Sequence, residues 1–230
     1  MLKFLLNSIL SFFIRIPLEG PQMPADAFKS VIGSKVALGF HKNAYPMSTG
    51  PFEVTIWYVK GMNEDGTLND DKPNEFNDIR GVFINDASGK PVITKTWEAT
   101  VDPSRYWTLH PMAPGGAAQI RMGQYTAWQV GDHHGHEALV QTGGPVTVYR
   151  DANKDFSRVG DAQNTGYFGI NQHWGYDLPK EDLANSSAGC LVGRTKDGHR
   201  EFMKIIKSDP RYLKDNRFVF TTTIFDGKLL

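Results

Sequence analysis

Residues 80–101, RGVFINDASGKPVITKTWEATV, have the pattern of a β-hairpin. Two runs rich in β-branched and aromatic residues, RGVFIN (80–85) and PVITKTWEATV (91–101), flank the short polar segment DASGK (86–90). Such side chains favour strands, and Gly89 can adopt the positive φ that a tight turn needs. The stretch therefore predicts two antiparallel strands joined by a turn.

Similar strand-like runs continue on both sides of this hairpin, at residues 52–59, 117–131, 137–141, 146–151, 166–175 and 217–227. We expect 137–141 and 146–151 to form a pair across the segment TGGP. In residues 197–210 the spacing is helical instead: Phe202, Ile205 and Ile206 fall on one face, and Pro210 stops the helix near Asp209. The prediction is a mainly β domain with one short helix, which follows the chain's only cysteine, Cys190.

The composition is that of a globular protein with a sizeable core. Of 230 residues, 40% are hydrophobic and 22% are charged, and 25 Lys and Arg balance 25 Asp and Glu. A formal net charge of zero argues against nucleic-acid binding through bulk electrostatics, so we expect no nucleic-acid partner. The single cysteine excludes an internal disulfide.

The N-terminal segment differs from the rest of the chain. Basic residues flank a mostly apolar stretch at 4–14, and Ala-Asp-Ala at 25–27 has the small-x-small shape of a signal-peptidase site. The apolar stretch is too short for a convincing membrane span. We predict that residues 1–30 form a leader or membrane-associated appendage, with membrane association through residues 1–16, and that residues 31–230 form the functional domain. An amphipathic surface helix and a poorly packed tail are the alternatives.

The segment NSSAGCLVGRT (185–195) places small residues just before Cys190, so that a substrate has room to approach. A cysteine nucleophile also needs a base and backbone N–H donors for the developing oxyanion. His173 lies 17 residues upstream, at the tip of an expected strand. It is placed to take the proton from Cys190 and return it to a leaving amine. From these residues alone, a buried and inert cysteine is the competing interpretation.

Four segments together resemble a known family. Residues 170–175 (INQHWG) and 187–190 (SAGC) resemble the signature of the L,D-transpeptidase catalytic domain, in which an Ile-x-x-His strand precedes a Ser-x-Gly-Cys segment. Residues 122–126 (MGQYT) are similar to the family's Gly-x-Phe/Tyr strand, and residues 81–101 resemble its opening hairpin. The order of the segments agrees, and the resemblance covers residues 79–195, about half of the chain.

The resemblance implies a β-sandwich or barrel that transfers acyl groups on peptidoglycan stem peptides, through a thioester and without metal or organic cofactor. Cys190 is then the nucleophile and His173 its base, Gly189 and the Cys190 amide help to form the oxyanion site, and Ser187 orients the histidine or the loop. The acyl group passes to an amine or to water. A location in the cell envelope or outside the cell follows, for a bacterial or phage-encoded protein. The expected substrate contacts are Arg194, Trp174, Asn171 and Tyr125.

The sequence departs from the family pattern at three positions. Trp174 follows His173, where the family usually has glycine, and Ala188 stands where the family often has the histidine of Ser-His-Gly-Cys. Val192 stands where the family commonly has an arginine, and the next arginine in this chain is Arg194, two residues later. The cysteine and histidine are intact, whereas the substrate contacts differ. This indicates a divergent member, with another amide or peptide substrate as an open alternative.

Two other classes of function compete with an acyltransferase. A catalytically silent wall-binding or phage structural domain predicts a blocked groove or a separated pair, whereas an enzyme needs the Cys190 sulfur and a His173 nitrogen within roughly 4 Å. A metallohydrolase built on His133, His134 and His136 is the other, although three histidines within four positions do not converge easily on one ion.

A calcium loop is suggested by Asp151, Asn153 and Asp155, which have the Asp-x-Asn-x-Asp spacing. Phe156 stands where the glycine is expected, and Ala162 stands where the glutamate is expected. A polar turn with bonds from side chain to backbone is therefore the expected structure.

Overall fold

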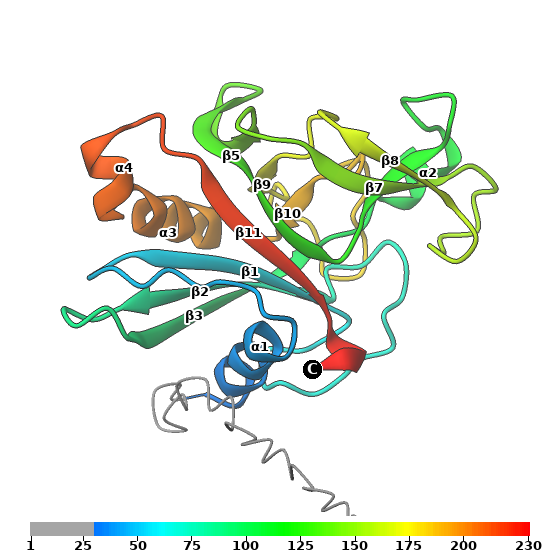
Figure 1. Cartoon of the computed structure of the whole chain (residues 1–230). Coiled ribbons are helices and arrows are strands. Elements are labelled where there is room, and N and C mark those ends of the chain that lie inside the picture. The colour runs from blue at the N-terminus through cyan, green and yellow to red at the C-terminus, as the bar shows by residue number, and fades with distance from the viewer. Residues whose placement is uncertain (1–29) are drawn as a thin grey trace, which may run out of the picture.

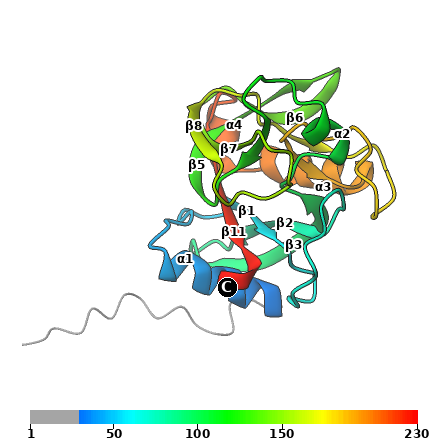
Figure 2. The same cartoon turned by 90° about the vertical axis from the view of Figure 1, so that its right-hand side faces the viewer.

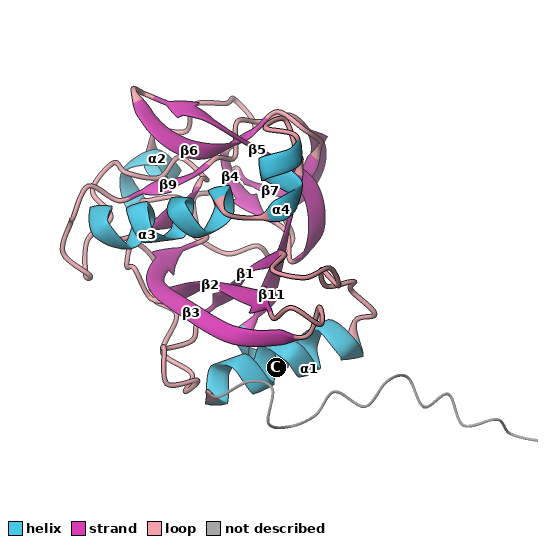
Figure 3. Cartoon of the chain, turned by 90° about the vertical axis from the view of Figure 1, so that its left-hand side faces the viewer, coloured by secondary structure: helices cyan, strands magenta, loops and turns pink. Residues whose placement is uncertain are grey.

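The computed structural model describes residues 30–230, so the predicted leader lies outside the described residues except for Ser30. Within residues 30–230, no helix combines the length and the apolar character that crossing a membrane requires. The described chain is mainly β, as predicted, and its centre is a closed barrel with helices packed outside (Figures 1 and 3).

Eight strands close the barrel in the order β1-β11-β5-β6-β9-β10-β3-β2. Two pairings in the barrel are parallel: β1 with β11, which lie far apart in the chain, and β9 with β10, which are consecutive strands joined by a long loop. The other pairings are antiparallel. The strands are β1 (Val54–Lys60), β2 (Asp78–Asn85), β3 (Pro91–Thr100), β5 (Gly123–His133), β6 (His136–Gln141), β9 (Gln172–Trp174), β10 (Leu191–Gly193) and β11 (Phe220–Asp226).

The predicted hairpin is confirmed as β2 and β3, which pair in antiparallel register. Gly89 has a φ of 83°, and its N–H donates to the Asp86 carbonyl at 3.0 Å. A Cβ at Gly89 would lie 2.1 Å from the Thr49 carbonyl oxygen, so this turn requires glycine for space as well as for conformation.

A second sheet of three strands, in the order β4-β7-β8, lies beside the barrel (Figure 1). Its strands are β4 (Ala117–Ile120), β7 (Val146–Asp151) and β8 (Ala162–Gly166). The predicted pairing of 137–141 with 146–151 is wrong, because β6 pairs with β5 and β9 while β7 pairs with β4 and β8. The Gly143 N–H bonds to the Ala127 carbonyl of β5 at 2.9 Å, which holds the connection against the barrel while the chain changes sheets.

Another expectation needs correction in residues 166–175. Gly166 ends β8, residues 167–171 are irregular, and only Gln172–Trp174 forms the strand β9. The irregular segment is nevertheless fixed, since the buried Trp128 indole N–H donates to the Ile170 carbonyl at 2.7 Å. Trp128 and Ile170 belong to the core cluster that fills the barrel, so packing positions the backbone just before His173.

The prediction of one helix is wrong, because three further α-helices exist. They are α1 (Val31–Lys42), α2 (Arg105–Leu109) and α4 (Pro210–Lys214), and a short 3-10 turn, Gly227–Leu229, ends the chain. In α1, Ile32, Val36 and Phe40 follow helical spacing and pack against barrel side chains such as Trp57 and Phe225. Figure 2 shows this helix beneath β1, β2 and β11, where it covers the outer face of that side of the barrel. Two internal glycines lower its helix propensity, which tertiary packing overrides.

The predicted helix after the cysteine is confirmed as α3 (Lys196–Lys207). The Thr195 side chain caps its N-terminus by accepting from the Gly198 amide at 3.2 Å. Phe202 and Ile206 are buried, and Ile205 packs beside them. Pro210, expected to stop the helix, begins α4.

Candidate active site

The parallel pairing of β9 and β10 brings His173 beside the segment that begins at Cys190. Val192 pairs with His173, and the Leu191 N–H bonds to the Asn171 carbonyl at 2.9 Å. The sulfur of Cys190, a ring nitrogen of His173 and a ring nitrogen of His133 all lie within 4.8 Å of one another. The Cys190 sulfur and a His173 ring nitrogen are therefore at most 4.8 Å apart, a separation over which a proton could pass after a small shift of either side chain.

His173 is buried, and its ring nitrogens have different roles. Nδ1 lies 2.8 Å from the Trp174 carbonyl, which can only accept, so Nδ1 carries the proton and Nε2 is left as an acceptor. Burial lowers the pKa of His173 to about 4, against the opposing effect of this carbonyl, and the nearby His133 and Arg80 lower it further. At neutral pH the ring is therefore uncharged and able to accept a proton.

Cys190 is 9% exposed, and burial raises the pKa of its thiol to about 11. The sulfur lies 3.5 Å from the Gly169 carbonyl, which can accept the S–H hydrogen. The resting pair is therefore a neutral thiol beside a neutral imidazole, and the thiolate forms only as the proton leaves for a base.

The turn before the sulfur is held by Ser187, which orients the loop and makes no contact with His173. Its hydroxyl lies 2.9 Å from the Asp102 carbonyl and 3.0 Å from the Cys190 carbonyl, and it accepts from the Gly189 N–H at 3.2 Å. The Gly189 amide is thus already used, contrary to its expected oxyanion role. The Cys190 N–H, in contrast, has no hydrogen-bond partner among residues 30–230.

Gly189 has a conformational role instead. Its φ is 123°, and a Cβ on this residue would lie 2.5 Å from the Ala118 carbonyl oxygen of β4. Only glycine tolerates both conditions, so Gly189 allows the turn to pass close to the second sheet.

A cavity of about 660 Å³ opens beside this turn, between the barrel and the second sheet. Cys190, His173 and His133 line it together with Tyr176, and none of its lining residues is Asp or Glu. Arg150 of β7 is its one Arg or Lys. The Arg150 guanidinium lies 4.6 Å above the Phe168 ring and makes one polar contact, from Nε to Asn164 Oδ1 at 3.3 Å.

Three predicted substrate contacts lie elsewhere. Arg194 pairs with Glu98 at 2.5 Å, away from the cavity lining. Trp174 projects from the opposite face of β9 to His173, as strand alternation requires, and Lys196 lies 4.8 Å above its ring. Tyr125 donates from its hydroxyl to the Arg121 carbonyl at 2.9 Å, far along β5 from the end that reaches the site.

The fourth predicted contact, Asn171, reaches the site through His133. Its Nδ2 lies 2.9 Å from His133 Nδ1, and the His133 ring stacks on His173 with centroids 4.5 Å apart. His133 was predicted only as part of a histidine-rich loop, so this position is a finding of the structure. The sequence feature that could have indicated this position is a hairpin turn at His134–Gly135. Such a turn places His133 and His136 opposite each other at the ends of the two strands.

The sequence suggests two metal sites only as alternatives, and the structure places their residues as follows. His134 and His136 do not join His133 in a cluster, because His136 turns to Trp174 at 5.2 Å between ring centroids. In the calcium-like loop, Asp151 accepts from the amides of Asp155 and Phe156 at 3.1 and 3.0 Å. This segment is the polar turn that the sequence predicts.

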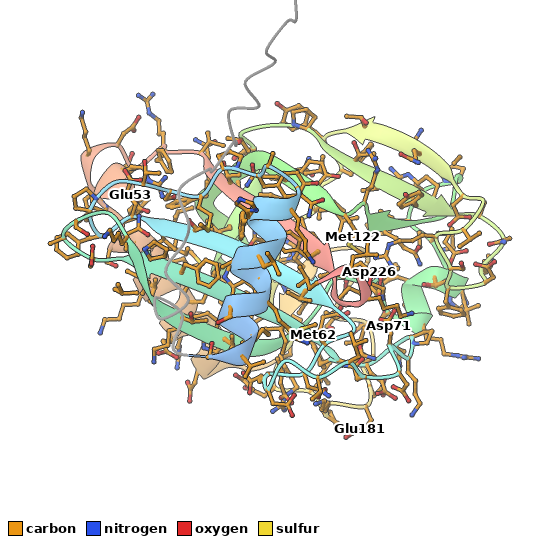
Figure 4. All side chains as sticks on the ribbon, turned by 60° about the horizontal axis from the view of Figure 1, so that its bottom comes forward. Glu53, Met62, Asp71, Met122, Glu181 and Asp226 are labelled. Carbon is orange, nitrogen blue, oxygen red and sulfur yellow. The ribbon has the colours of Figure 1, made fainter. Side chains whose placement is uncertain are left out.

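A partly buried network of charges supports the other side of the Ser187 turn. Asp102, whose carbonyl receives the Ser187 hydroxyl, pairs through its carboxylate with Lys60 and with Arg158 at 2.6 Å. Lys60 also pairs with Asp71 at 2.6 Å. These groups line a second cavity of about 560 Å³, and Figure 4 labels three of its lining residues, Asp71, Met122 and Asp226.

We expect Asp102→Asn to lower the free energy of unfolding by about 3–5 kcal/mol, because Lys60 and Arg158 would keep their charges without the carboxylate they share. Urea denaturation at pH 7 measures this loss. Asp70→Asn is the control, since Asp70 pairs with Lys72 on the exposed surface and its loss should leave the midpoint unchanged. Equal midpoints for Asp102→Asn and wild type would contradict the assigned role.

The difference in unfolding free energy between wild type and Asp102→Asn should also depend on pH, in a direction that the Asp102 pKa determines. Burial by itself raises the pKa of Asp102, but the charges of Arg158 and Lys60 outweigh it and bring the pKa to about 2. A folded-state pKa below the unfolded value stabilises the protein above about pH 4, and this contribution is lost as the pH falls through about 2. The stability difference between wild type and Asp102→Asn should therefore shrink between pH 4 and pH 2.

No family model matches the chain, and comparisons with curated proteins and with solved structures found no similar protein. The geometry of the site therefore carries the functional argument.

Proposed function

We propose that the chain is a cysteine-dependent acyltransferase or peptidase. The observation that carries this proposal is the neutral His173 ring with Nε2 free, beside a neutral Cys190 thiol at the wall of an open cavity. The proximity of the two residues supports an enzyme over a silent domain, since the sulfur and a His173 ring nitrogen lie within 4.8 Å of each other and both residues line the cavity.

The reaction follows from the proton positions. His173 Nε2 takes the thiol proton as the Cys190 sulfur attacks an amide carbonyl, and a C–S bond forms while the carbonyl π electrons move to oxygen. The oxyanion then collapses, the C–N bond breaks, and the departing nitrogen takes the proton back from His173. The thioester that remains is resolved by an amine or by water, with His173 again accepting a proton.

The Cys190 N–H is the backbone donor for the oxyanion in this scheme. It belongs to the nucleophile itself, so it lies close to any carbonyl that the sulfur attacks. Its lack of a partner among residues 30–230 leaves it available, whereas the Gly189 N–H is bound to Ser187. A preorganised donor of this kind stabilises charge that exists only in the transition state.

The resemblance to L,D-transpeptidase catalytic domains makes peptidoglycan stem peptides the proposed substrates, at the cell envelope or outside the cell. Two features of the cavity support an acyl donor that carries a carboxylate. Its lining contains no Asp or Glu, and Arg150 presents a guanidinium whose Nη atoms have no polar partner among the described residues. Such a fork binds a carboxylate through two parallel hydrogen bonds.

The test is the covalent adduct itself. We expect incubation with a stem tetrapeptide, or with a carbapenem as a strained amide, to add one acyl mass to the intact protein, and peptide mapping should place it on Cys190. Protein alkylated beforehand at Cys190 is the matched control and should gain no acyl mass. An unmodified Cys190 with both reagents, in protein that remains folded, would reject the enzyme and favour the silent domain.

Arg150→Met should raise KM for a peptide with a free carboxylate by about 10- to 100-fold, because one bidentate charged contact contributes roughly 1.5–3 kcal/mol. Methionine keeps the apolar stem against Phe168. The measurement is acylation rate against peptide concentration, with the same peptide amidated at its carboxyl end as the comparison. A similar KM increase for both peptides would show that Arg150 does not bind the carboxylate.

A further inference from the structure

A chain of two hydrogen bonds determines where His133 carries its proton. The Gln141 backbone N–H donates to Asn171 Oδ1 at 2.9 Å, which fixes the amide orientation because a carbonyl oxygen must face that donor. The NH2 group of Asn171 is then the end that faces His133 Nδ1, also at 2.9 Å. Since an NH2 group donates, His133 Nδ1 must be the unprotonated nitrogen.

The remaining nitrogen of His133 is therefore a donor. Burial lowers the pKa of His133, and the neighbouring His134 lowers it further, so the ring is neutral at pH 7 and its single proton is on Nε2. Nε2 has no hydrogen-bond partner among residues 30–230, and the residue lines the cavity. An N–H group on the cavity wall is thus left without an acceptor.

The two stacked histidines have opposite tautomers. His173 donates from Nδ1 to the Trp174 carbonyl and is left with an acceptor at Nε2. His133 accepts at Nδ1 from Asn171 and is left with a donor at Nε2. Their rings are 25° from parallel, and both have a nitrogen within 4.8 Å of the Cys190 sulfur.

We infer that His133 is a catalytic hydrogen-bond donor that stabilises the negative charge developing beside Cys190, and that Asn171 is the positioning residue that fixes its tautomer. This inference rests on the proposed acyl transfer for its catalytic part. His173 accepts the thiol proton while the His133 N–H donates to the sulfur or to the carbonyl oxygen it attacks. The donor comes from the β5–β6 hairpin, a different element from the one that carries the cysteine.

A metal centre is the main competing use of the same three side chains, since a thiolate with two imidazoles can bind zinc. The hydrogen bonds argue against it. A metal ligand needs an unprotonated nitrogen, and the only such nitrogen of His133 already accepts from Asn171.

The first test needs no substrate. Long-range nitrogen–proton NMR spectra of the full chain distinguish the two tautomers of each histidine. We expect Nε2–H for His133 and Nδ1–H for His173 at pH 7. In Asn171→Asp, a carboxylate oxygen replaces the NH2 group and should move the His133 proton to Nδ1. A wild-type His133 with its proton on Nδ1 would overturn the inference, whatever the protein's activity.

The second test measures charge stabilisation at Cys190. The ionisable groups around Cys190 are His173 from β9, Tyr58 and Arg80 inside the barrel, and Arg150 and Tyr176 on the cavity wall. His133 itself has His134, Asp132 and His136 beside it in the β5–β6 hairpin. His133→Phe keeps a ring against His173 and removes the donor, whereas His133→Gln keeps an N–H donor. We expect the pH profile of iodoacetamide alkylation to move to higher pH in His133→Phe and to stay near that of wild type in His133→Gln.

The kinetic effect follows the same order. Acylation by a stem peptide should fall by about 100- to 1,000-fold in His133→Phe, the loss that accompanies removal of one oxyanion donor, and much less in His133→Gln. If wild type alkylates as expected but is never acylated, the proposed function fails and the donor role at the sulfur stands. An unchanged alkylation profile in folded His133→Phe would overturn the donor role. Stoichiometric Zn²⁺ binding that protects Cys190 from alkylation would overturn it as well.

Discussion

Cys190→Ser should abolish acyl transfer while the fold is retained. The serine hydroxyl has almost the size of the thiol and can donate to the Gly169 carbonyl that now faces the sulfur at 3.5 Å. A hydroxyl is, however, a much weaker nucleophile than a thiol whose proton is being removed. We expect a loss on the order of a millionfold, the size that removing a catalytic nucleophile causes.

The measurement combines turnover of a stem peptide with intact-mass detection of the acyl adduct. Thermal unfolding of Cys190→Ser should match that of wild type, which separates lost chemistry from lost structure. Ser208→Ala, on the exposed end of α3, is a control that changes a hydroxyl away from the cavity. Turnover that survives in Cys190→Ser would reject the cysteine as the nucleophile.

His173→Ala should slow acylation and alkylation of Cys190 at pH 7 by between about 100- and 10,000-fold, the usual range for a general base. The physical reason is that the Cys190 thiol must lose its proton before the sulfur can react. Burial raises the pKa of Cys190 to about 11, so almost none of it is ionised at pH 7 unless a base accepts the proton. With His173 absent, only bulk hydroxide or buffer remains.

The dependence of the reaction rate on pH should also differ between wild type and His173→Ala, in a direction that the His173 pKa determines. Burial lowers the pKa of His173 to about 4, so in wild type the reaction should stay fast through neutral pH and decline as the ring becomes protonated near pH 4. His173→Ala should lack this acidic decline and accelerate only as the pH rises toward about 11. The exposed His41 of α1 supplies the control His41→Ala, which should follow wild type. Identical profiles for His173→Ala and wild type would remove His173 from the mechanism.

Arg80 adds a long-range contribution that the sequence pattern did not suggest. It is buried inside the barrel, two of its nitrogens have no hydrogen-bond partner, and Gly193 leaves it room, since a Cβ there would lie 2.4 Å from Nη2. After burial, the neighbouring His133 and the charge of Arg80 help to hold the pKa of His173 down. The barrel interior thus keeps the ring uncharged at neutral pH, and the same effects make His173 a weaker base for the thiol proton.

Local pattern was sufficient for the features whose cause is local. The hairpin of β2 and β3 needs only β-branched runs and a glycine at the turn, and α3 needs only its apolar spacing and the Thr195 cap. The same reasoning could not find α1, because its two glycines weaken the helix and only contact with Trp57 and Phe225 stabilises it. Nor could it show that β6 and β7 belong to different sheets.

Residue patterns along the chain were enough to predict a mainly β protein, a helix after Cys190, and a site that contains Cys190 and His173. The rest of the site became visible only in the folded chain. His133 and Arg150 line the cavity, Asn171 holds the His133 ring through a hydrogen bond, and Arg194, Trp174 and Tyr125 lie away from the cavity. The spacing of apolar side chains that indicates a strand or a helix involves residues close together in the sequence. A site, in contrast, forms where strand pairings bring together residues that are far apart in the sequence. Here those pairings are β5 with β6, β6 with β9, and β9 with β10.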